Sequence, residues 1–412
     1  MIGVAVLGYG TVGSGVYDVI NENNNILAKR IGKGIEVLHV LDLREFPNDS
    51  VTNILTHDFN DILSDEKVSI VAEVMGGIEP AYTFSKQAIM AGKSVITSNK
   101  SLVAEHGPEL MELAKKYNVS YLFEASVGGC IPIIRPLCVS LTADDILEIS
   151  GILNGTTNYI LTKMTQEGLS FGEVLKSAQD LGYAEADPTA DVEGHDACRK
   201  IAILSSLAYE NPVNFKDIYT EGITKITDLD IEYAKAINST IKLIASSKKT
   251  ANGLAAKVCP LVLNNEHPLS TINGVYNAVF VKGNMSGNTM YFGSGAGKLP
   301  TASAVVADIV DAAKNAGKTV EVYRNCSSVA KVEPLSSVET RALIRVAFYN
   351  KEETKVSCKE VFGEIEFIEI GKEDELALIT SFETEEVLMN KKALIATKNG
   401  IKEVRNLIRM EG

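Results

Sequence analysis

Short apolar runs alternate with amphipathic stretches along the first third of the chain. Residues 2–7, IGVAVL, form an apolar run typical of a buried parallel strand, and the helical pattern SGVYDVINEN follows it after a glycine-rich turn. Further strand-like runs are EVLHVLD, VSIVAEVMGG (68–77) and SVITSNK (94–100), and the helical AYTFSKQAIMAG lies between the last two. This alternation predicts an α/β fold with a doubly wound, Rossmann-type parallel sheet.

The pattern changes after YLFEASVGG, so we place a domain boundary near residue 130. We expect the next region, 131–295, to be an α+β domain, in which the strand EISGIL ends in NGTTN and a helix follows. Thr156 and Thr157 are good capping residues for that helix. A cluster of polar side chains at such a turn can equally bind a small polar ligand.

The last region follows a linker, VEPLSSVET (332–340). It shows the pattern strand, helix, strand, strand, helix, strand, which begins with ETRALIRVAFYN and ends with IKEVRNLIRMEG. This order is that of the ferredoxin-like motif. We therefore expect a further domain over 335–412.

Composition and charge narrow the classes of function. Apolar residues make up 45% and charged residues 23% of the 412 residues, as in ordinary soluble globular proteins. The net charge of −13 and the lack of a basic stripe disfavour binding to a nucleic-acid backbone. The sequence contains no run of about eighteen apolar residues, so no membrane span is predicted. The apolar N-terminus lacks the basic residues and the cleavage site of a secretion signal.

The cysteines occur singly, without a C-x-x-C pair, so neither a zinc site nor a disulfide framework is expected. The reducing cytoplasm is therefore the natural location. The cysteines are Cys130, Cys138, Cys198, Cys259, Cys326 and Cys358.

A glycine-rich motif follows the first strand. It reads G-x-G-x-x-G between a strand and a helix, and consists of Gly8, Gly10, Thr11, Val12 and Gly13 with one tyrosine. The first glycine permits the tight turn, the second lets the backbone approach a pyrophosphate, and the third lets strand and helix pack closely. The helix N-terminus offers N–H groups and a partial positive charge to phosphates. We therefore predict dinucleotide binding; the alternative is a glycine-rich turn in another α/β fold.

Two further places bear on the cofactor. Asp42 ends the second strand, where an acid usually binds the ribose hydroxyls of NAD, whereas Arg44 could accept the extra phosphate of NADP. Ser98, Asn99 and Lys100 end the fourth strand, at the edge where ligands bind in such sheets. Lys100 is thus either a site residue or a surface lysine in a loop.

The stretch GYAEADPTADVEGHDACRK (182–200) crowds carboxylates beside one lysine. Gly182 and Pro188 indicate a loop. The dipole of the helix that follows accounts for Asp191 and Glu193 without any function.

Glu185, Asp196 and Lys200 remain to be explained. Asp196 and Lys200 are four residues apart and therefore neighbours on a helix, where an exposed pair is worth about 0.3–0.5 kcal/mol. In the functional alternative, Lys200 gives a proton to the alkoxide formed when a nicotinamide enzyme reduces a carbonyl. Glu185 and Asp196 would then bind an ammonium group of the substrate.

Seven segments, in order along almost the whole chain, resemble the homoserine dehydrogenase family. They are GYGTVGSGV, GGIEPAY, ITSNKSLVAEHG, EASVGGCIPII, GILNGTTNYIL, GYAEADPTADVEGHDACRK and GSGAGKLPTASAVVADI. The fifth and sixth are the most specific. The resemblance implies reversible reduction of L-aspartate 4-semialdehyde to L-homoserine with NADPH or NADH, on the route from aspartate to threonine, isoleucine and methionine.

The resemblance also implies roles for single residues. Lys200 would transfer the proton, and Lys100 would be a second lysine near the nicotinamide and the substrate. The substrate-binding residues would be Gly182, through its backbone, Glu185, Asp191 and Asp196.

A monovalent-cation site, usually for sodium, is implied for residues 124–131. Its ligands would be the carbonyl oxygens of Glu124, Val127, Gly129 and Ile131. Oxygen ligands suit a hard cation. The alternative is a plain glycine turn.

The segment GSGAGK resembles the part of the family in which Gly295 or Gly297 lies near the nicotinamide. The helix that opens near Thr301 would then return the chain to the dinucleotide-binding domain. That domain would consist of residues 1–130 together with 296–320.

One departure from the family concerns the cofactor. Many relatives carry an arginine just before the aspartate that ends the second strand, where it suits a 2′-phosphate. This chain has Leu41 there, although Arg44 could substitute. We expect NADP or NAD as the cofactor, with NADH usable.

The C-terminal region resembles the ACT regulatory domain of many family members, whose usual effector is threonine. Asn350, Lys351 and Glu352 stand where a Pro-Gly turn is common in such sites, so threonine inhibition stays open. The family also implies a homodimer or a higher homo-oligomer, formed through the middle domain.

Two other functions compete with this interpretation. One is a different Rossmann-type dehydrogenase of small molecules, and the other is an inactive regulator that senses nucleotides. The second would bind the cofactor without turnover, and the presence of Lys100, Glu185, Asp196 and Lys200 argues against it.

Overall fold

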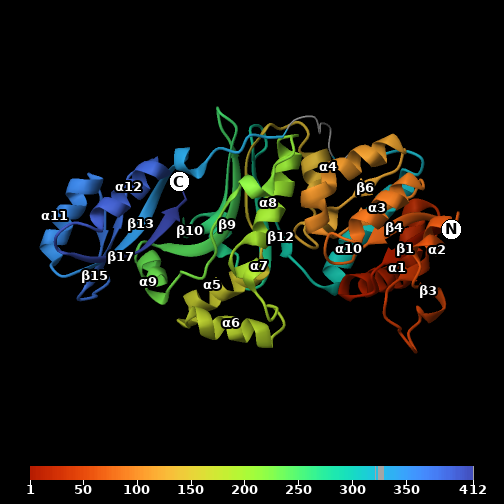
Figure 1. Cartoon of the computed structure of the whole chain (residues 1–412), viewed down its shortest axis with the longest axis horizontal. Helices are drawn as coiled ribbons and strands as arrows, with labels where there is room; N and C mark the ends of the chain where they lie inside the picture. The colour runs from red at the N-terminus through yellow and green to blue at the C-terminus, as the bar shows by residue number, and fades with distance from the viewer. Residues whose placement is uncertain (321, 323–328, 412) are drawn as a thin grey trace. The chain divides into compact units, whose positions relative to one another are not determined.

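The structure is a computed structural model that describes residues 1–320, 322 and 329–411, so Cys326 lies outside the described residues. The chain folds into two compact units (Figure 1). The first unit consists of Met1–Ile146, Ala202–Phe215 and Lys282–Ala330. The second unit consists of Leu147–Ile201, Lys216–Val281 and Lys331–Gly412.

A parallel sheet in the order β3-β2-β1-β4-β5-β6 forms the first unit. Its strands are β1 (Ile2–Leu7), β2 (Ile35–Leu41), β3 (Leu55–Thr56), β4 (Val68–Glu73), β5 (Ser94–Thr97) and β6 (Tyr121–Leu122). Its helices include α1 (Thr11–Ile31), α2 (Phe59–Ser64), α3 (Ala81–Met90), α4 (Lys100–Lys116) and α10 (Lys298–Lys314). The predicted α/β fold with a Rossmann-type parallel sheet is confirmed.

Two predicted strands are too long at their carboxyl ends. β4 ends at Glu73 rather than 77, because the Glu73 carboxylate accepts the N–H of Met75 at 2.8 Å and turns the chain. β5 ends at Thr97 rather than 100, because the side chain of Asn99 accepts the N–H of Leu102 at 3.1 Å and caps α4. Lys100 is therefore the first residue of a helix.

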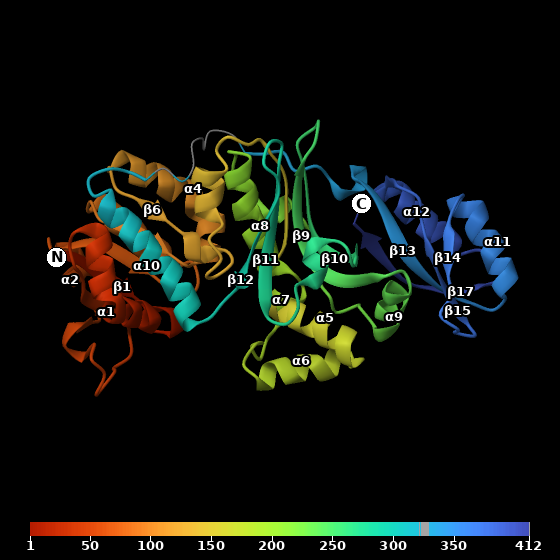
Figure 2. The same ribbon diagram turned by 180° about the vertical axis from the view of Figure 1, so that it is seen from behind.

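Helix α10 belongs to the core of the first unit. Ala302, Val305 and Ile309 are buried with apolar residues of β1 and α1, and α1 and α10 lie side by side in Figures 1 and 2. A Cβ added to Gly15 of α1 would lie 2.8 Å from the carbonyl oxygen of Lys298. Glycine thus lets the two helices approach closely, and this brings the segment after residue 296 back to the first sheet. The helix begins three residues before Thr301.

The second unit has a mixed sheet in the order β11-β7-β9-β10-β17-β13-β15-β14. Its strands before residue 300 are β7 (Ile146–Ile152), β8 (Tyr219–Thr220), β9 (Ser239–Lys249), β10 (Leu254–Asn264) and β11 (Tyr276–Gly283). The next strand, β12 (Gly287–Ser294), falls in the first unit. The helices that follow β7 are α5 (Gly155–Glu167), α6 (Phe171–Asp180), α7 (Thr189–Val192), α8 (His195–Ala208) and α9 (Asp228–Ala236).

The C-terminal segment has the predicted order of strands and helices, with one short strand added. Its elements are β13 (Glu339–Phe348), α11 (Lys351–Phe362), β14 (Glu366–Ile368), β15 (Glu375–Ile379), β16 (Glu383–Thr384), α12 (Glu385–Ile395) and β17 (Ile401–Met410). Side chains of α11 and α12 share one apolar core with β13, β15 and β17. Figure 2 shows both helices beside these strands. β17 also pairs in parallel with β10, so this segment extends the sheet of the second unit. The division into three domains stays a prediction.

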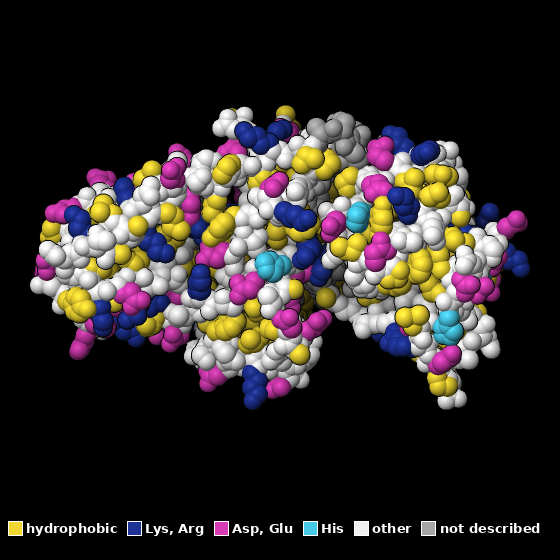
Figure 3. All heavy atoms as spheres, viewed as in Figure 1, with side chains coloured by type: hydrophobic (Ala, Val, Ile, Leu, Met, Phe, Trp, Pro, Cys, Tyr) yellow, Lys and Arg dark blue, Asp and Glu magenta, His cyan; other side chains and the backbone are white. Residues whose placement is uncertain are grey.

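The surface carries charges of both signs. On the face shown in Figure 3, lysine and arginine side chains are interspersed with aspartate and glutamate. None of the helices in the described part of the chain is both long and apolar enough to cross a membrane.

Candidate functional site

The glycine-rich turn of the first unit has the geometry of a phosphate-binding loop. Gly8 has a positive φ of 93°, and a Cβ on Gly13 would lie 1.9 Å from the carbonyl oxygen of Gly8. By contrast, a Cβ on Gly10 would meet nothing within 4 Å. Gly10 precedes α1 without a side chain to cap it, which leaves the first N–H groups of the helix to a ligand. The turn therefore fits a dinucleotide.

At the end of β2, the two candidate residues for cofactor choice bind each other. Arg44 donates from Nε and Nη2 to the two carboxylate oxygens of Asp42, at 2.9 and 2.8 Å. The same carboxylate accepts the N–H of Tyr9 at 2.8 Å. The hydrogen bond from Arg44 holds the pKa of Asp42 well below its usual range. An acid suited to a ribose and a cation suited to a phosphate thus neutralise each other in this structure.

The residues after β5 lie at the carboxyl edge of the sheet, as predicted. Ser98 is half-buried and donates its N–H to the carbonyl oxygen of Glu73 at 3.4 Å. Lys100 is half-buried at the start of α4. Ligands of open parallel sheets bind at this edge.

The predicted cation stretch folds into a tight turn. Gly128 and Gly129 have positive φ values of 75° and 56°. The carboxylate of Glu124 accepts three backbone N–H groups, from Ile133, Ile134 and Arg135, at 2.6, 2.8 and 2.8 Å. In the described residues no group of three His, Cys, Asp or Glu side chains could hold a metal ion. A site built from backbone carbonyls lies outside that finding, so the cation site stays a prediction.

Gly129 and Gly295, predicted for two different sites, are in direct contact. A Cβ on Gly129 would lie 2.6 Å from the carbonyl carbon of Gly295, and Cys130 donates its N–H to the carbonyl oxygen of Ser294 at 3.2 Å. Gly297 follows with a φ of 133° and precedes α10. The turn at 128–130 and the GSGAGK segment therefore form one structure.

Sequence reasoning missed a buried acid beside Glu124. Asp308 of α10 accepts the N–H of Glu124 at 2.8 Å. Burial, together with the charge of Glu124, raises the pKa of Asp308 to about 8, and burial also raises the pKa of Glu124. The signal available in the sequence was the position of Asp308 within the apolar helical stretch ASAVVADIV.

The second unit brings three of the predicted residues together, namely Asp191, Asp196 and Lys200. The Nζ of Lys200 on α8 donates to Asp196 at 2.7 Å and to the carbonyl oxygen of Leu153 at 2.8 Å. Asp196 is 3% exposed and Lys200 is 8% exposed. The alternative of an exposed surface pair is therefore wrong, since α8 packs this charged pair against the end of β7. A lysine held beside a carboxylate in a buried place is suited to moving a proton.

Asn154 organises this cluster and was missed. Its side-chain amide donates to Asp191 at 2.7 Å and to Asp196 at 2.9 Å. Its oxygen accepts the N–H of Thr157 at 2.9 Å, so Asn154 is the N-cap of α5. Thr156, one of the two residues expected to cap, instead donates to the carbonyl oxygen of Tyr183 at 2.7 Å. An asparagine directly after a strand and before a helix was the available signal.

Two predicted residues of the acidic loop lie outside the cluster. Gly182 has a positive φ of 74° and is exposed, as is Glu185. Among the described residues, the carboxylate of Glu185 has no hydrogen-bond or ion-pair partner. The loop itself is held near the cluster because Tyr183 binds Thr156.

A buried lysine supports α5 from β9. The Nζ of Lys242 donates to Asn158 of α5 at 3.1 Å, to the carbonyl oxygen of Ile272 at 2.6 Å and to Asn273 at 3.0 Å. Burial lowers the pKa of Lys242 to about 8. A lysine inside the apolar pattern TIKLIA was the signal in the sequence.

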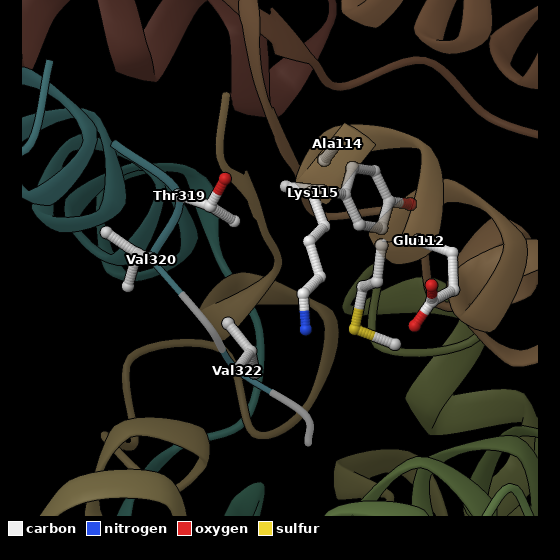
Figure 4. A pocket seen from close by; sticks show the side chains of 8 residues that line it. Glu112, Ala114, Lys115, Thr319, Val320 and Val322 are labelled. Carbon is white, nitrogen blue, oxygen red and sulfur yellow. The ribbon is translucent and has the colours of Figure 1, made fainter. Parts of the chain in front are cut away.

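A small hollow of the first unit contains none of the predicted site residues. It lies between α4 and a group of residues that consists of Tyr121, Thr319, Val320 and Val322. Figure 4 shows the side chain of Lys115 between Glu112 on one side and Thr319 and Val320 on the other.

The parallel sheet with its phosphate-binding turn and the buried lysine among carboxylates define an NAD(P)-dependent oxidoreductase. A family model described as homoserine dehydrogenase, NAD binding domain, matches residues 8–124, and one described as homoserine dehydrogenase matches residues 132–310. The chain belongs to the homoserine dehydrogenase family, and its function is that of an NAD(P)-dependent homoserine dehydrogenase.

Relatives and solved structures agree with this assignment. Homoserine dehydrogenase of Mycobacterium tuberculosis is 38% identical over 435 residues, which cover 100% of this chain and 98% of that protein. The enzyme of Corynebacterium glutamicum is 46% identical over 321 residues, 76% of this chain and 72% of that protein. The crystal structure of a homoserine dehydrogenase from Thiobacillus denitrificans is similar with a TM-score of 0.92, at 35% identity, over 100% of this chain and 98% of that chain.

One similar structure contains a cofactor. A hyperthermophilic archaeal homoserine dehydrogenase mutant in complex with NADPH has a TM-score of 0.65 and 29% identity, over 76% of this chain and 97% of that chain.

The buried Lys242 predicts a pH dependence of stability. Its pKa is about 8 in the folded chain and about 10.5 when unfolded, so the unfolded chain binds more protons between these values and stability rises with pH there. The rise amounts to about 3 kcal/mol in the free energy of unfolding. Lys242→Met should remove it. Chemical denaturation at pH 7.5 and pH 10.5 measures this.

Lys248→Met is the matched control, because Lys248 lies on the same strand and is exposed. The difference in the free energy of unfolding between Lys248→Met and the unmodified chain should be equal at both pH values. If the change in the free energy of unfolding caused by Lys242→Met were also equal at both pH values, burial would not lower the pKa of Lys242.

Proposed function

We propose that the enzyme reversibly reduces L-aspartate 4-semialdehyde to L-homoserine, with Lys200 as the proton donor and Asp196 and Glu185 as ligands of the substrate ammonium group. The observation that carries the assignment of Lys200 is the buried position of its Nζ, 2.7 Å from Asp196 and 2.8 Å from the carbonyl oxygen of Leu153. Lys100, at the edge of the first sheet, is proposed from the family as a lysine near the nicotinamide and the substrate. The product leads from aspartate towards threonine, isoleucine and methionine.

The chain's residues complete the reaction in the following way. Bound NAD(P)H supplies the hydride that the aldehyde carbon accepts. The aldehyde oxygen then carries negative charge, and the ammonium group of Lys200 gives it a proton. Asp196 accepts a hydrogen bond from this ammonium group at 2.7 Å and so holds its Nζ in place. Asn154 spreads the charge of Asp191 and Asp196 by donating to both, so that the pair can face a cationic substrate.

Lys200→Met tests this role. We expect kcat with aspartate semialdehyde to fall by about 10²–10⁴-fold, because the alkoxide loses its proton donor. The Kd of NADPH, measured by fluorescence, should stay within about threefold of the unmodified value. Retention of more than about a tenth of kcat would remove Lys200 from the chemical step.

Lys163→Met is the matched control for this test. Lys163 forms an i,i+4 pair with Glu167 on α5, but the side chains are 34% and 45% exposed. It should leave kcat unchanged. The double variant Lys200→Met, Asp196→Asn removes the unpaired buried charge, so its folding, followed by circular dichroism, separates lost chemistry from lost structure. Cofactor binding with no turnover by the unmodified chain would instead support the inactive regulator.

We infer that both cofactors are used. Asp42 can accept the ribose hydroxyls of NAD, and Arg44, paired with Asp42 by two hydrogen bonds, can bind the phosphate of NADP. The Arg44 side chain is 61% exposed, so it is able to turn towards a phosphate, and the Asp42 side chain, which is 10% exposed, then keeps the N–H of Tyr9 as a donor. This supports dual use rather than strict choice.

We propose further that a sodium ion binds the carbonyl oxygens of Glu124, Val127, Gly129 and Ile131. All four residues are buried. The carbonyls of Val127, Gly129 and Ile131 accept no hydrogen bond from the described residues. Buried carbonyls without a partner are costly, and a cation would satisfy them.

Replacing sodium by choline at constant ionic strength tests the cation site. We expect activity to fall, because the turn at 128–130 contacts Gly295 and the cation would fix both. Addition of sodium chloride should restore it. Equal activity in sodium and in choline, with the protein free of sodium by elemental analysis, would rule the site out.

For the C-terminal segment we propose an ACT-like regulatory domain that binds threonine. Arg409 of β17 pairs with Glu385 of α12 at 2.5 Å and with Glu221, next to β8, at 2.6 Å. Arg345 of β13 pairs with Asp230 of α9 at 2.8 Å. These buried pairs connect the segment to the rest of its unit, in which the Lys200 cluster lies.

The effect of threonine on activity is expected to pass through Arg409. Glu221 precedes Gly222, and a Cβ on Gly222 would lie 2.2 Å from the carbonyl oxygen of Val192, the last residue of α7. Arg409→Met should therefore raise the threonine concentration for half-inhibition by about tenfold or more. Arg405→Met, on the same strand in an exposed pair with Glu403, should not. Full activity of the unmodified enzyme in saturating threonine would refute the proposal.

A homodimer formed through the middle region stays a prediction from the family.

A further inference from the structure

A buried carboxylate at the end of β4 has no role in the site described so far. Glu73 is 0% exposed. One of its oxygens accepts the N–H of Met75 at 2.8 Å, and the other accepts the hydroxyl of Thr97, at the end of β5, at 2.5 Å. Glu73 therefore joins the ends of two neighbouring strands at the edge where the cofactor binds.

The hydrogen bonds continue through Thr97 into the loop that carries Lys100. The hydroxyl oxygen of Thr97 accepts the N–H of Asn99 at 2.9 Å. The side chain of Asn99 donates to the carbonyl oxygen of Gly77 at 2.5 Å and accepts the N–H of Leu102 at the start of α4. One connected network thus fixes the loop after β4 and the loop after β5.

The loop after β1 is held by the same network through packing. The N–H of Val74 donates to the carbonyl oxygen of Leu7 at 3.0 Å. A Cβ on Gly8 would lie 3.0 Å from the side chain of Met75 and 3.4 Å from its backbone. The residue that Glu73 binds therefore lies against the first glycine of the phosphate-binding turn.

A carboxylate at this buried position costs free energy, because a charged group loses its contact with water. In the described part of the chain no lysine or arginine pairs with Glu73; Tyr121 of β6, Thr97, Asn99 and the N–H of Met75 face it. Burial raises the pKa of Glu73 to about 7. An apolar residue would fill the space without burying a charge, but it would leave the Met75 N–H and the Thr97 hydroxyl without their acceptor.

We propose that Glu73 is a positioning residue for the dinucleotide, which it serves by holding Met75 and Thr97 so that the loops after β1, β4 and β5 keep the shape the cofactor needs. The inference rests on the proposed binding of the cofactor at Gly8–Gly13 and Ser98–Lys100. Glu73 acts on the cofactor through these loops rather than by contact.

Two substitutions in the full chain test this inference. Glu73→Ala removes both acceptors and should raise the Kd and the KM of NADPH by about tenfold or more, while the KM of aspartate semialdehyde changes by less than about threefold. Glu73→Gln keeps the acceptor for the N–H of Met75, and its amide can donate to the hydroxyl oxygen of Thr97, which reverses the direction of that hydrogen bond. It should therefore restore the NADPH constants to within about threefold. A residue that served only general stability would not separate the two substrates in this way.

Lys93→Met is the matched control. Lys93 is 4% exposed and donates to the carbonyl oxygens of Asp65 and Val68, both at 2.8 Å, around the opposite end of β4. It should lower the unfolding temperature and leave the Kd of NADPH unchanged. If Glu73→Ala does not fold, Thr97→Val, which removes one hydroxyl at constant volume, takes its place with the same expected change in Kd.

The outcomes separate this inference from the proposed function. An unchanged Kd of NADPH in Glu73→Ala, or an equal rise in Glu73→Ala and Lys93→Met, would overturn the positioning role alone. An unmodified chain that does not bind NADPH would overturn the proposed cofactor site itself.

Discussion

The buried ion pair between Lys200 and Asp196 is the interaction around which the polar cluster of the second unit is built. Removing one partner from such a pair leaves a buried charge uncompensated, at a cost of about 3–5 kcal/mol. The pair also dictates where its neighbours lie, because the carbonyl of Leu153 accepts from Lys200 and Asn154 donates to Asp196. A single turn between β7 and α5 thus ends a strand, caps a helix and completes the site.

The first unit achieves its order mainly by close approach of backbone to backbone. Gly13, Gly15 and Gly129 each occupy a place where a side chain would collide with another part of the main chain. Hydrogen bonds from the ends of β4 and β5 then fix the loops between these contacts. The two units therefore differ: the first is ordered mainly by close contacts between backbone groups, and the second is built around buried side-chain charges.

Much of this architecture could be read from the sequence, since buried parallel strands appear as apolar runs and the G-x-G-x-x-G motif follows the first of them. The ends of β4 and β5 could not, because Glu73 and Asn99 turn the chain through side-chain hydrogen bonds that an apolar pattern does not reveal. The burial of Lys200 could not be read from the sequence for a related reason: the exposure of a helical pair depends on what packs against it. The pairing of β17 with β10 joins residues more than a hundred positions apart, which no local pattern can indicate.

The return of α10 to the first core has a practical consequence for anyone dividing this protein. Ala302 and Val305 cover apolar side chains of β1 and α1, although residues 147–201 and 216–281 of the second unit lie between them in the chain. A fragment that stops at residue 146 would leave this face open to water and to aggregation. An isolated nucleotide-binding fragment therefore has to carry Lys298–Lys314 grafted behind it as its final helix.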